Sequence, residues 1–416
     1  MQADANKKCV QELIVFGDVH YASYWDHVAD IIAHRDDILN PNTEFERFLA
    51  HMSTERSDVA VVNLGDAIDY FLCDYETTPA TATNNRDLFY AALDAAGLVC
   101  DEILGNHDFR LVPYNLRFGG LSQINLRDQE CQHILTELGH GRLRNPLTEL
   151  RSLARLGSRI DPLRNFRGFQ KPAFERRASF NCIFLNTRGD LLGRAIGLGH
   201  AAWQLLCAVV ARQAAGLQPS LRRLSVDCAG LDQADLAFID RTLRECGPET
   251  TIVFMHAPVI NPARTAIGGR ATLTLRRLGA CLQAQGYAHN VIAAGGEGLL
   301  RIVRSPANVE RNIVIIAAHV HCARYILIDK ASLIARQVHV EELNAAWNNA
   351  RYIKHITALP VGVIDPAAGG TCTGYGRIGR SGFAEVVLRR FEQGRCVAAS
   401  WPQAKPTAEP LLERAG

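Results

Sequence analysis

Apolar runs of strand length recur along the chain, and several of them end in a cluster of polar residues. Their length is typical of buried β-strands. Segments with helical spacing lie between them at residues 43–55, 85–97 and 231–247. Strands that alternate with helices predict an α/β fold. The five runs with polar ends span residues 12–20, 58–69, 98–108, 249–259 and 310–321.

The polar residues at these ends are carboxylates, one carboxamide and several imidazoles. In an α/β fold, the carboxyl ends of successive strands meet along one edge of the sheet, where ligands commonly bind. We therefore expect these residues to converge. They are Asp18, His20, Asp66, Asp69, Asn106, His107, Asp108, His256, His319 and His321.

Composition is that of a globular protein. The chain has 416 residues, of which 48% are hydrophobic, enough for a large core in a single domain spanning residues 1–416. Residues 323–340 and 382–400 are predicted to form two β-hairpins. The apolar run near the N-terminus is too short for a signal peptide, and the twelve cysteines include no C-x-x-C pair. We expect a cytoplasmic protein with free thiols.

Nitrogen and oxygen donors mixed in this way suit Mn²⁺, Zn²⁺ or Fe²⁺ better than Ca²⁺. Apart from His107, the strand ends offer two carboxylates, one carboxamide and four imidazoles. That set is too large for one tetrahedral ion. It suits two ions about 3.5–4 Å apart that share a carboxylate and a bridging hydroxide, an arrangement used for attack on phosphorus.

The motifs that carry these residues occur in a defined order. D-x-H begins at Asp18, G-D-x-x-D at Gly65 and G-N-H-D at Gly105; the lone His256 and an H-x-H pair starting at His319 follow. In this order they resemble the motifs of the calcineurin-like metallophosphoesterases. The resemblance implies a four-layer α/β/β/α sandwich, here with a mostly helical basic insertion. It covers residues 11–108, 178–187 and 231–390.

The resemblance also implies seven metal ligands, three for each ion and one shared by both. Asp18, His20 and His321 would hold the first ion, Asn106, His256 and His319 the second, and Asp66 would bridge the two. We expect Mn²⁺, with iron and zinc as the alternatives.

Three further residues have roles implied by the resemblance. His107 would face the substrate and stabilise or protonate the leaving oxygen, Asp108 would orient its ring, and Asp69 would support the site without contacting a metal. The chain departs from the family at Ala318, where the usual motif G-H-x-H has glycine. Because glycine permits a positive φ, alanine predicts a different turn before His319.

These features predict a metallophosphoesterase that hydrolyses phosphoester or pyrophosphate bonds through a metal-bridging hydroxide. One alternative is a lipid-linked pyrophosphatase at the membrane surface, since GDAIDYFLCDYE and GNHDF resemble motifs of the UDP-diacylglucosamine pyrophosphatases. Another is a non-catalytic binding module on the same fold. The sequence leaves the choice between monoester, diester and pyrophosphate open, as well as the oligomeric state.

Charge is distributed unevenly along the chain. The formal net charge is only +2, but residues 141–224 hold fifteen lysines and arginines against four acidic residues, an excess of +11. This predicts contact with an anionic, phosphorylated substrate. We expect the insertions at 109–178 and 188–230 to form a substrate cap and residues 401–416 to form a flexible tail.

One segment of the basic region, residues 195–211, carries no formal charge. It could be a buried cap or dimer helix, a lid for a lipid substrate, or a membrane contact, and it is marginal in length for a membrane span. Beside cationic side chains it makes peripheral contact with an anionic membrane an alternative for residues 141–224. Nucleic acid is a weaker partner because the arginines lack interleaved aromatic residues. Other histidines, His51 and His355 among them, match no motif and are interpreted as ordinary.

Overall fold

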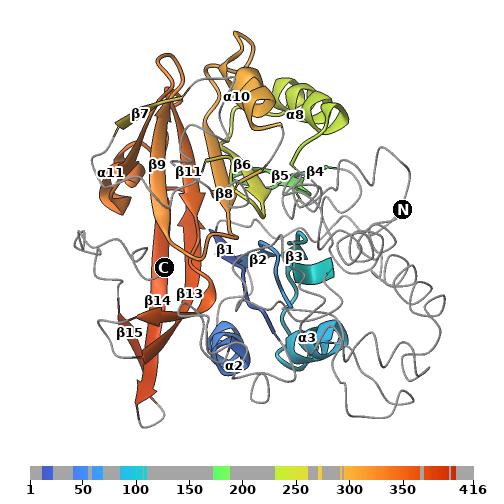
Figure 1. Cartoon of the computed structure of the whole chain (residues 1–416), viewed down its shortest axis with the longest axis vertical. Coiled ribbons are helices and arrows are strands. Elements are labelled where there is room, and N and C mark those ends of the chain that lie inside the picture. The colour runs from blue at the N-terminus through green and yellow to red at the C-terminus, as the bar shows by residue number, and fades with distance from the viewer. Residues whose placement is uncertain are drawn as a thin grey trace, which may run out of the picture.

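The computed structural model consists of two packed β-sheets with helices on their outer faces (Figure 1). The insertions at 109–178 and 188–230, the segment 195–211 and the tail 401–416 lie wholly or largely outside the residues that the structure describes. Those residues are 12–21, 41–54, 59–68, 85–105, 107–109, 172–187, 230–260, 270–273, 291–292, 295–365, 370–392 and 395–399.

The first sheet has seven strands. They are β1 (Glu12–Phe16), β2 (Val59–Asn63), β3 (Asp101–Glu102), β12 (Val361–Asp365), β13 (Gly370–Gly379), β14 (Gly382–Glu392) and β15 (Arg395–Ala399). Their order is β15-β14-β13-β1-β2-β3, with β12 paired to β13. Because β1, β2 and β3 are parallel, their carboxyl ends lie at one edge of the sheet.

The second sheet has eight strands. They are β4 (Ala173–Arg176), β5 (Asn181–Leu185), β6 (Thr251–Met255), β7 (Arg270–Thr272), β8 (Ile313–Ala317), β9 (Arg324–Asp329), β10 (Ile334–Val338) and β11 (Tyr352–Thr357). Their order is β4-β5-β6-β8-β11-β9-β10-β7. The four central strands β5, β6, β8 and β11 are parallel, so their carboxyl ends also share an edge.

Three apolar cores separate four layers. The helices α2 (Pro41–Met52) and α3 (Asn85–Ala95) cover the first sheet through a core that includes Phe45 and Phe89. The helices α8 (Gln233–Glu245) and α10 (Gly296–Arg304) cover the second sheet through a core that includes Ile239 and Leu300. A third core lies between the sheets and also holds residues of the short helix α11 (Val340–Ala345). The predicted α/β/β/α sandwich is therefore confirmed.

The strands of the second sheet show why continuous apolar runs were needed. All five residues of β6 are buried, and side chains alternate between the two faces of a strand. Val253 and Met255 pack in the core beneath α8 and α10, whereas Ile252 and Phe254 pack between the sheets. Both faces of the strand are covered, so no position calls for a polar side chain.

The predicted hairpins at 323–340 and 382–400 are present as the antiparallel pairs β9–β10 and β14–β15. The run at 98–104 differs from the expectation, because only Asp101 and Glu102 are assigned to β3. As an edge strand, β3 pairs with β2 alone, through Val62 and Asn63. An edge strand needs few ladder bonds to hold its end in place, and this one still delivers the residues that follow it.

The chain leaves β5 and returns toward α8 at one point. The N–H of Gly230 donates to the carbonyl of Thr187, with 2.8 Å between nitrogen and oxygen.

Within the basic region 141–224, only residues 172–187 are described. There Arg177 is buried and forms ion pairs with Asp101 and Glu175, so this arginine contributes to the packing of the sandwich.

A buried lysine lies in β11. The Lys354 side chain has no exposed surface, and its Nζ donates to the side-chain oxygen of Asn312 and, at 2.6 Å, to the carbonyl of Asn349. Burial, with a smaller contribution from the charge of Lys330, lowers the pKa of Lys354 from 10.5 to about 7. Between these pH values the folded protein binds fewer protons at Lys354 than the unfolded chain does.

Raising the pH from 7 to 10 is therefore expected to stabilise the folded protein through Lys354. The unfolded chain binds a proton at Lys354 that is released on folding, and a lower proton concentration favours this release. Each unit of pKa shift corresponds to about 1.4 kcal/mol, so the effect amounts to several kcal/mol at most. The measurement is the free energy of unfolding at several pH values for the wild type and Lys354→Met. The stability of the wild type should rise relative to that of Lys354→Met as the pH rises; parallel curves would contradict the expectation.

Candidate metal centre

The predicted site residues that the structure describes follow the carboxyl ends of parallel strands in both sheets. Asp18 and His20 follow β1, Asp66 follows β2, His107 and Asp108 lie in the 3₁₀ turn η1 (His107–Phe109) after β3, His256 follows β6, and His319 and His321 follow β8. Asn106 and Asp69 lie outside the described residues. The two sheets thus bring their polar strand ends to one place.

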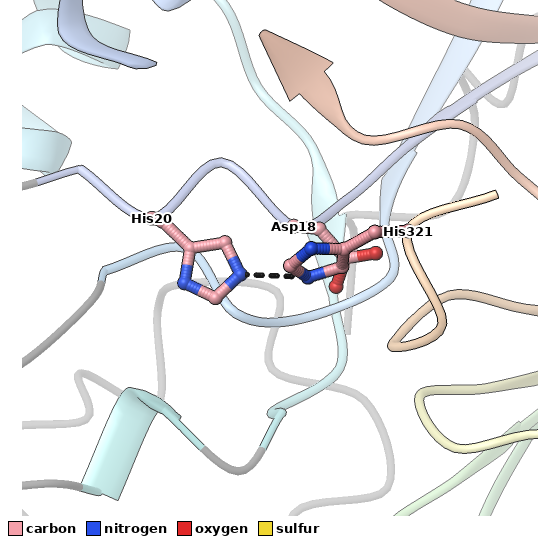
Figure 2. Close-up of side chains that lie close together, drawn as sticks. All are labelled: Asp18, His20 and His321. Carbon is pink, nitrogen blue, oxygen red and sulfur yellow. Dashed lines mark hydrogen bonds between the residues drawn. The ribbon is translucent and has the colours of Figure 1, made fainter. Parts of the chain in front are cut away.

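The first group of donors consists of Asp18, His20 and His321. One donor atom from each lies within 4.8 Å of the others. Figure 2 shows a ring nitrogen of His20 directed at one of His321, and these Nε2 atoms are 3.1 Å apart. If two ligand atoms each lie about 2.1 Å from one ion and their bonds to it form a right angle, the two atoms are about 3.0 Å apart. The observed separation therefore fits a shared ion.

The second group consists of Asp66, His256 and His319, again with donor atoms within 4.8 Å of one another. The Nε2 atom of His256 lies 3.2 Å from Oδ2 of Asp66. On the other side of the ring, Nδ1 donates to the carbonyl of Leu64 at 2.9 Å. A histidine held through Nδ1 in this way directs Nε2 at a metal.

Asp66 occupies the centre of the cluster. Its Oδ1 accepts the backbone N–H of His107 at 2.7 Å, and a third group of donors within 4.8 Å consists of His20, Asp66 and His107. The rings of His20 and His107 meet edge to face with centroids 4.3 Å apart. Asp66 thus belongs to the second and third groups, and His20, which the third group shares with the first, has its Nε2 atom 3.9 Å from Oδ2 of Asp66.

Backbone strain concentrates at the same residues. Six non-glycine residues among those described have a positive φ, and five of them are predicted ligands with φ between 49° and 72°. A side chain in this region of backbone space costs on the order of 1–3 kcal/mol, and such residues tend to occur at functional sites. The five are Asp18, His20, Asp66, His319 and His321.

Hydrogen bonds between loops hold the site together. The N–H groups of Asp18 and His20 donate to the carbonyls of Gly65 and Asp66, both at 2.9 Å, so the loops after β1 and β2 run side by side. The N–H of His319 donates to the carboxylate of Asp18 at 2.9 and 3.1 Å. This last contact joins the two sheets.

Gly105 allows the loops after β2 and β3 to approach closely. A Cβ atom at Gly105 would lie 2.2 Å from Oδ1 of Asp66, which no side chain could tolerate without moving the carboxylate. Asp108 reinforces this approach: its carboxylate accepts the N–H groups of Gly105, Asp66 and Ala67 at 2.7, 3.0 and 2.9 Å. Asp108 therefore fixes the backbone around Asp66, and its predicted effect on the ring of His107 stays a prediction.

Burial and charge shift the pKa values of the central residues. Burial raises the pKa of Asp18 to about 6, despite the imidazoles nearby. Burial also favours the neutral form of Asp66, but the charges of His256 and His107 hold the pKa of this carboxyl well below its usual value. Burial opposes the charge on His256, but the adjacent Asp66 raises the pKa of its imidazole to about 9. Without a bound cation, a proton on His256 would balance the charge of Asp66.

Two buried carboxylates surrounded by imidazole nitrogens suit divalent cations, which would take the place of such protons. Metal binding should then weaken as the pH falls. The donor atoms are mixed nitrogen and oxygen, as expected for Mn²⁺, Fe²⁺ or Zn²⁺.

Ala318 has a negative φ, so the residue does not need the backbone freedom of glycine. Its side chain is buried in the core between the sheets, and its N–H donates to the carbonyl of His256 at 2.8 Å. The positive φ occurs one residue later, at His319, where it is 72°. The departure from the family motif is thus accommodated before the histidine pair.

Two residues beside the site matched no motif. Thr187, at the end of β5, accepts the N–H of Ala257 through Oγ1 at 3.0 Å. His355, in β11, accepts the N–H of Val259 through Nε2 at 3.3 Å. Neither residue follows a run that ends in a polar cluster, so no local pattern could have indicated them.

No model of a known protein family matches the chain, and no curated protein has a similar sequence. Within the described residues, no helix is long and apolar enough to cross a membrane. Among the described residues, Cys246 is buried and is a free thiol.

Several solved structures resemble this one distantly. A dimetal phosphatase from Danio rerio is 18% identical, with a TM-score of 0.43 over 90% of this chain and 98% of that chain. PhoD is 10% identical, with a TM-score of 0.45 over 94% and 68%. The purple acid phosphatase PPD1 from yellow lupin (Lupinus luteus) seeds is 11% identical, with a TM-score of 0.39 over 93% and 52%. Likenesses this distant leave the assignment of a function to the residues of the site.

Proposed function

We propose that the chain is a calcineurin-like metallophosphoesterase that hydrolyses phosphoester or pyrophosphate bonds with two divalent metal ions. The observation that supports this most strongly is that the two donor groups meet at Asp66, which belongs to the second group and lies 3.9 Å from Nε2 of His20 in the first. In this proposal the first ion is held by Asp18, His20 and His321 and the second by His256 and His319, with Asp66 shared. Asn106 completes the second set on the resemblance alone.

The chain's own residues divide the work of the reaction. When bound, two metal ions supply Lewis acidity for the phosphoryl oxygens and acidify the attacking water. His107, buried beside His20, would donate a proton from its imidazole to the leaving oxygen. The carboxylate of Asp66 accepts the backbone N–H of His107 and so positions the backbone from which the imidazole extends. Asp108 would act by holding the loop that carries Asp66.

The substrate in this proposal is anionic and phosphorylated. The excess of positive charge in residues 141–224 supports it, even though Arg177 already has carboxylate partners. A lipid-linked pyrophosphate is the more specific alternative, and it would place the enzyme in the cytoplasm with peripheral contact to an anionic membrane.

A substrate panel tests the proposal. Protein stripped with a chelator should be inactive, and loading with Mn²⁺, Fe²⁺ or Zn²⁺ should restore hydrolysis. The panel contains an aryl phosphate monoester, an aryl phosphate diester, a nucleotide and a UDP-linked diacyl sugar pyrophosphate, with released phosphate or phenol as the readout. Protein that binds two ions but hydrolyses none of these would instead be a binding module. Selective turnover of the lipid substrate would support the lipid-linked alternative.

A further inference from the structure

The segment from His256 to Val259 is held by unusual partners. Two of its carbonyl groups accept from the main chain: the N–H of Ala318 donates to His256, and the N–H of Ile292 donates to Pro258 at 3.0 Å. The N–H groups of Ala257 and Val259 are instead accepted by side chains, those of Thr187 and His355. Thr187 follows β5 by two residues, and His355 lies in β11.

Thr187 accepts from the residue directly after His256. Its side chain is fully buried, and the 3.0 Å bond from the N–H of Ala257 to Oγ1 replaces a strand bond that β6 no longer makes past its end. The His256 ring is anchored separately through Nδ1 to Leu64. Backbone and ring are therefore fixed independently.

His355 lowers the stability of the fold because it buries a polar ring atom, which an apolar residue would not do. Because Nε2 accepts a hydrogen bond, the neutral ring carries its proton on Nδ1, and the described part of the chain offers this buried atom no partner. An unsatisfied buried donor costs about 1–3 kcal/mol. Burial also lowers the pKa of His355 to about 4, so the ring stays neutral near pH 7. Its acceptor atom is the property that valine or leucine in β11 could not supply.

We propose that Thr187 and His355 are positioning residues that fix the segment His256–Val259, so that Nε2 of His256 meets the metal held with Asp66. This inference rests on the proposed function. Neither side chain needs to touch the metal or the substrate, since each acts on the backbone that carries His256.

The test is a titration of chelator-stripped protein with Mn²⁺ by calorimetry, with His256→Ala used to identify the binding step of the second donor group. Thr187→Val keeps the shape of the side chain but removes the acceptor, and should weaken that step by about 10–100-fold. The other step should change by less than about threefold, well short of that effect. Thr187→Ser should restore the affinity. His355→Leu should act like Thr187→Val, and His355→Gln should retain part of the affinity.

Thr373→Val is the matched control. Thr373 is a buried threonine of β13, and its hydroxyl donates to Glu44 of α2, so the loss of this hydroxyl should leave both binding steps unchanged. The thermal midpoint of each metal-free variant shows whether it folds, and His355→Leu carries the test if Thr187→Val does not. Equal weakening of both steps, or no weakening, would overturn the inference while leaving the proposed function intact. A wild type that binds fewer than two ions would overturn both.

Discussion

Replacing Asp66 with alanine is expected to reduce phosphoester hydrolysis on the order of 1,000-fold or more and to lower the metal content from two ions per chain to one or none. Asp66 is a member of the second donor group, and its Oδ2 lies 3.9 Å from Nε2 of His20 in the first. Metal ions supply several kcal/mol of transition-state stabilisation, and each 1.4 kcal/mol is tenfold in rate. Elemental analysis of the purified protein and initial rates with an aryl phosphate measure the two effects.

Two variants separate the loss of the ligand from the loss of structure. Asp66→Asn keeps an oxygen that can accept the N–H of His107, so the loop should stay in place while the charge is lost. Asp240→Ala removes a carboxylate on α8 that pairs with Arg244, far along the sequence from any site residue, and should leave metal content unchanged. Retention of two ions by Asp66→Ala would exclude the shared ligand role.

Replacing His107 with alanine should lower hydrolysis by about 100–10,000-fold while both metal ions remain bound, because a positioned general acid contributes about this much. The loss should be larger for an alkyl phosphate than for an aryl phosphate, since an alkoxide is the poorer leaving group and depends more on protonation. Rates for both substrates and the metal content of the same preparation provide the measurement.

His51→Ala is the control for His107→Ala. His51 lies in α2, and its ring bonds the hydroxyl of Tyr375 at 2.7 Å, so its removal should not affect the reaction. Unchanged hydrolysis in His107→Ala would remove the proposed role. Loss of metal together with activity would instead place His107 among the ligands, as the third donor group allows.

The polar strand ends could be predicted because the pattern that marks them is local. β6 and β8 are buried at every position and apolar except at Thr251, and the polar residue follows within four positions of the strand end. The same alternation of strands and helices gave the α/β class. The arrangement in two sheets came from the resemblance, because no periodicity tells which of two sheets a strand joins.

Contacts between distant segments could not be predicted in this way. Thr187 and His355 contact the segment after β6 only because β5 and β11 belong to the same sheet, and neither lies in a motif. Asp108 was expected to act on its neighbour His107, whereas its described bonds go to amides that include those of Asp66 and Ala67, about forty positions earlier. Backbone amides are present at every residue, so sequence carries no signal for such partners.

The hydrogen bond from the N–H of Gly230 to the carbonyl of Thr187 joins the two ends of the segment 188–229, with 2.8 Å between nitrogen and oxygen. Between fixed ends of this kind, doubling the length of the intervening sequence costs only about 0.6 kcal/mol of closure entropy. Because this bond fixes both ends, the register of β5 and β6 should depend little on the length of sequence between residues 187 and 230. Diversification of this stretch by natural selection or by engineering is separable, in thermodynamic terms, from maintenance of the strands on either side.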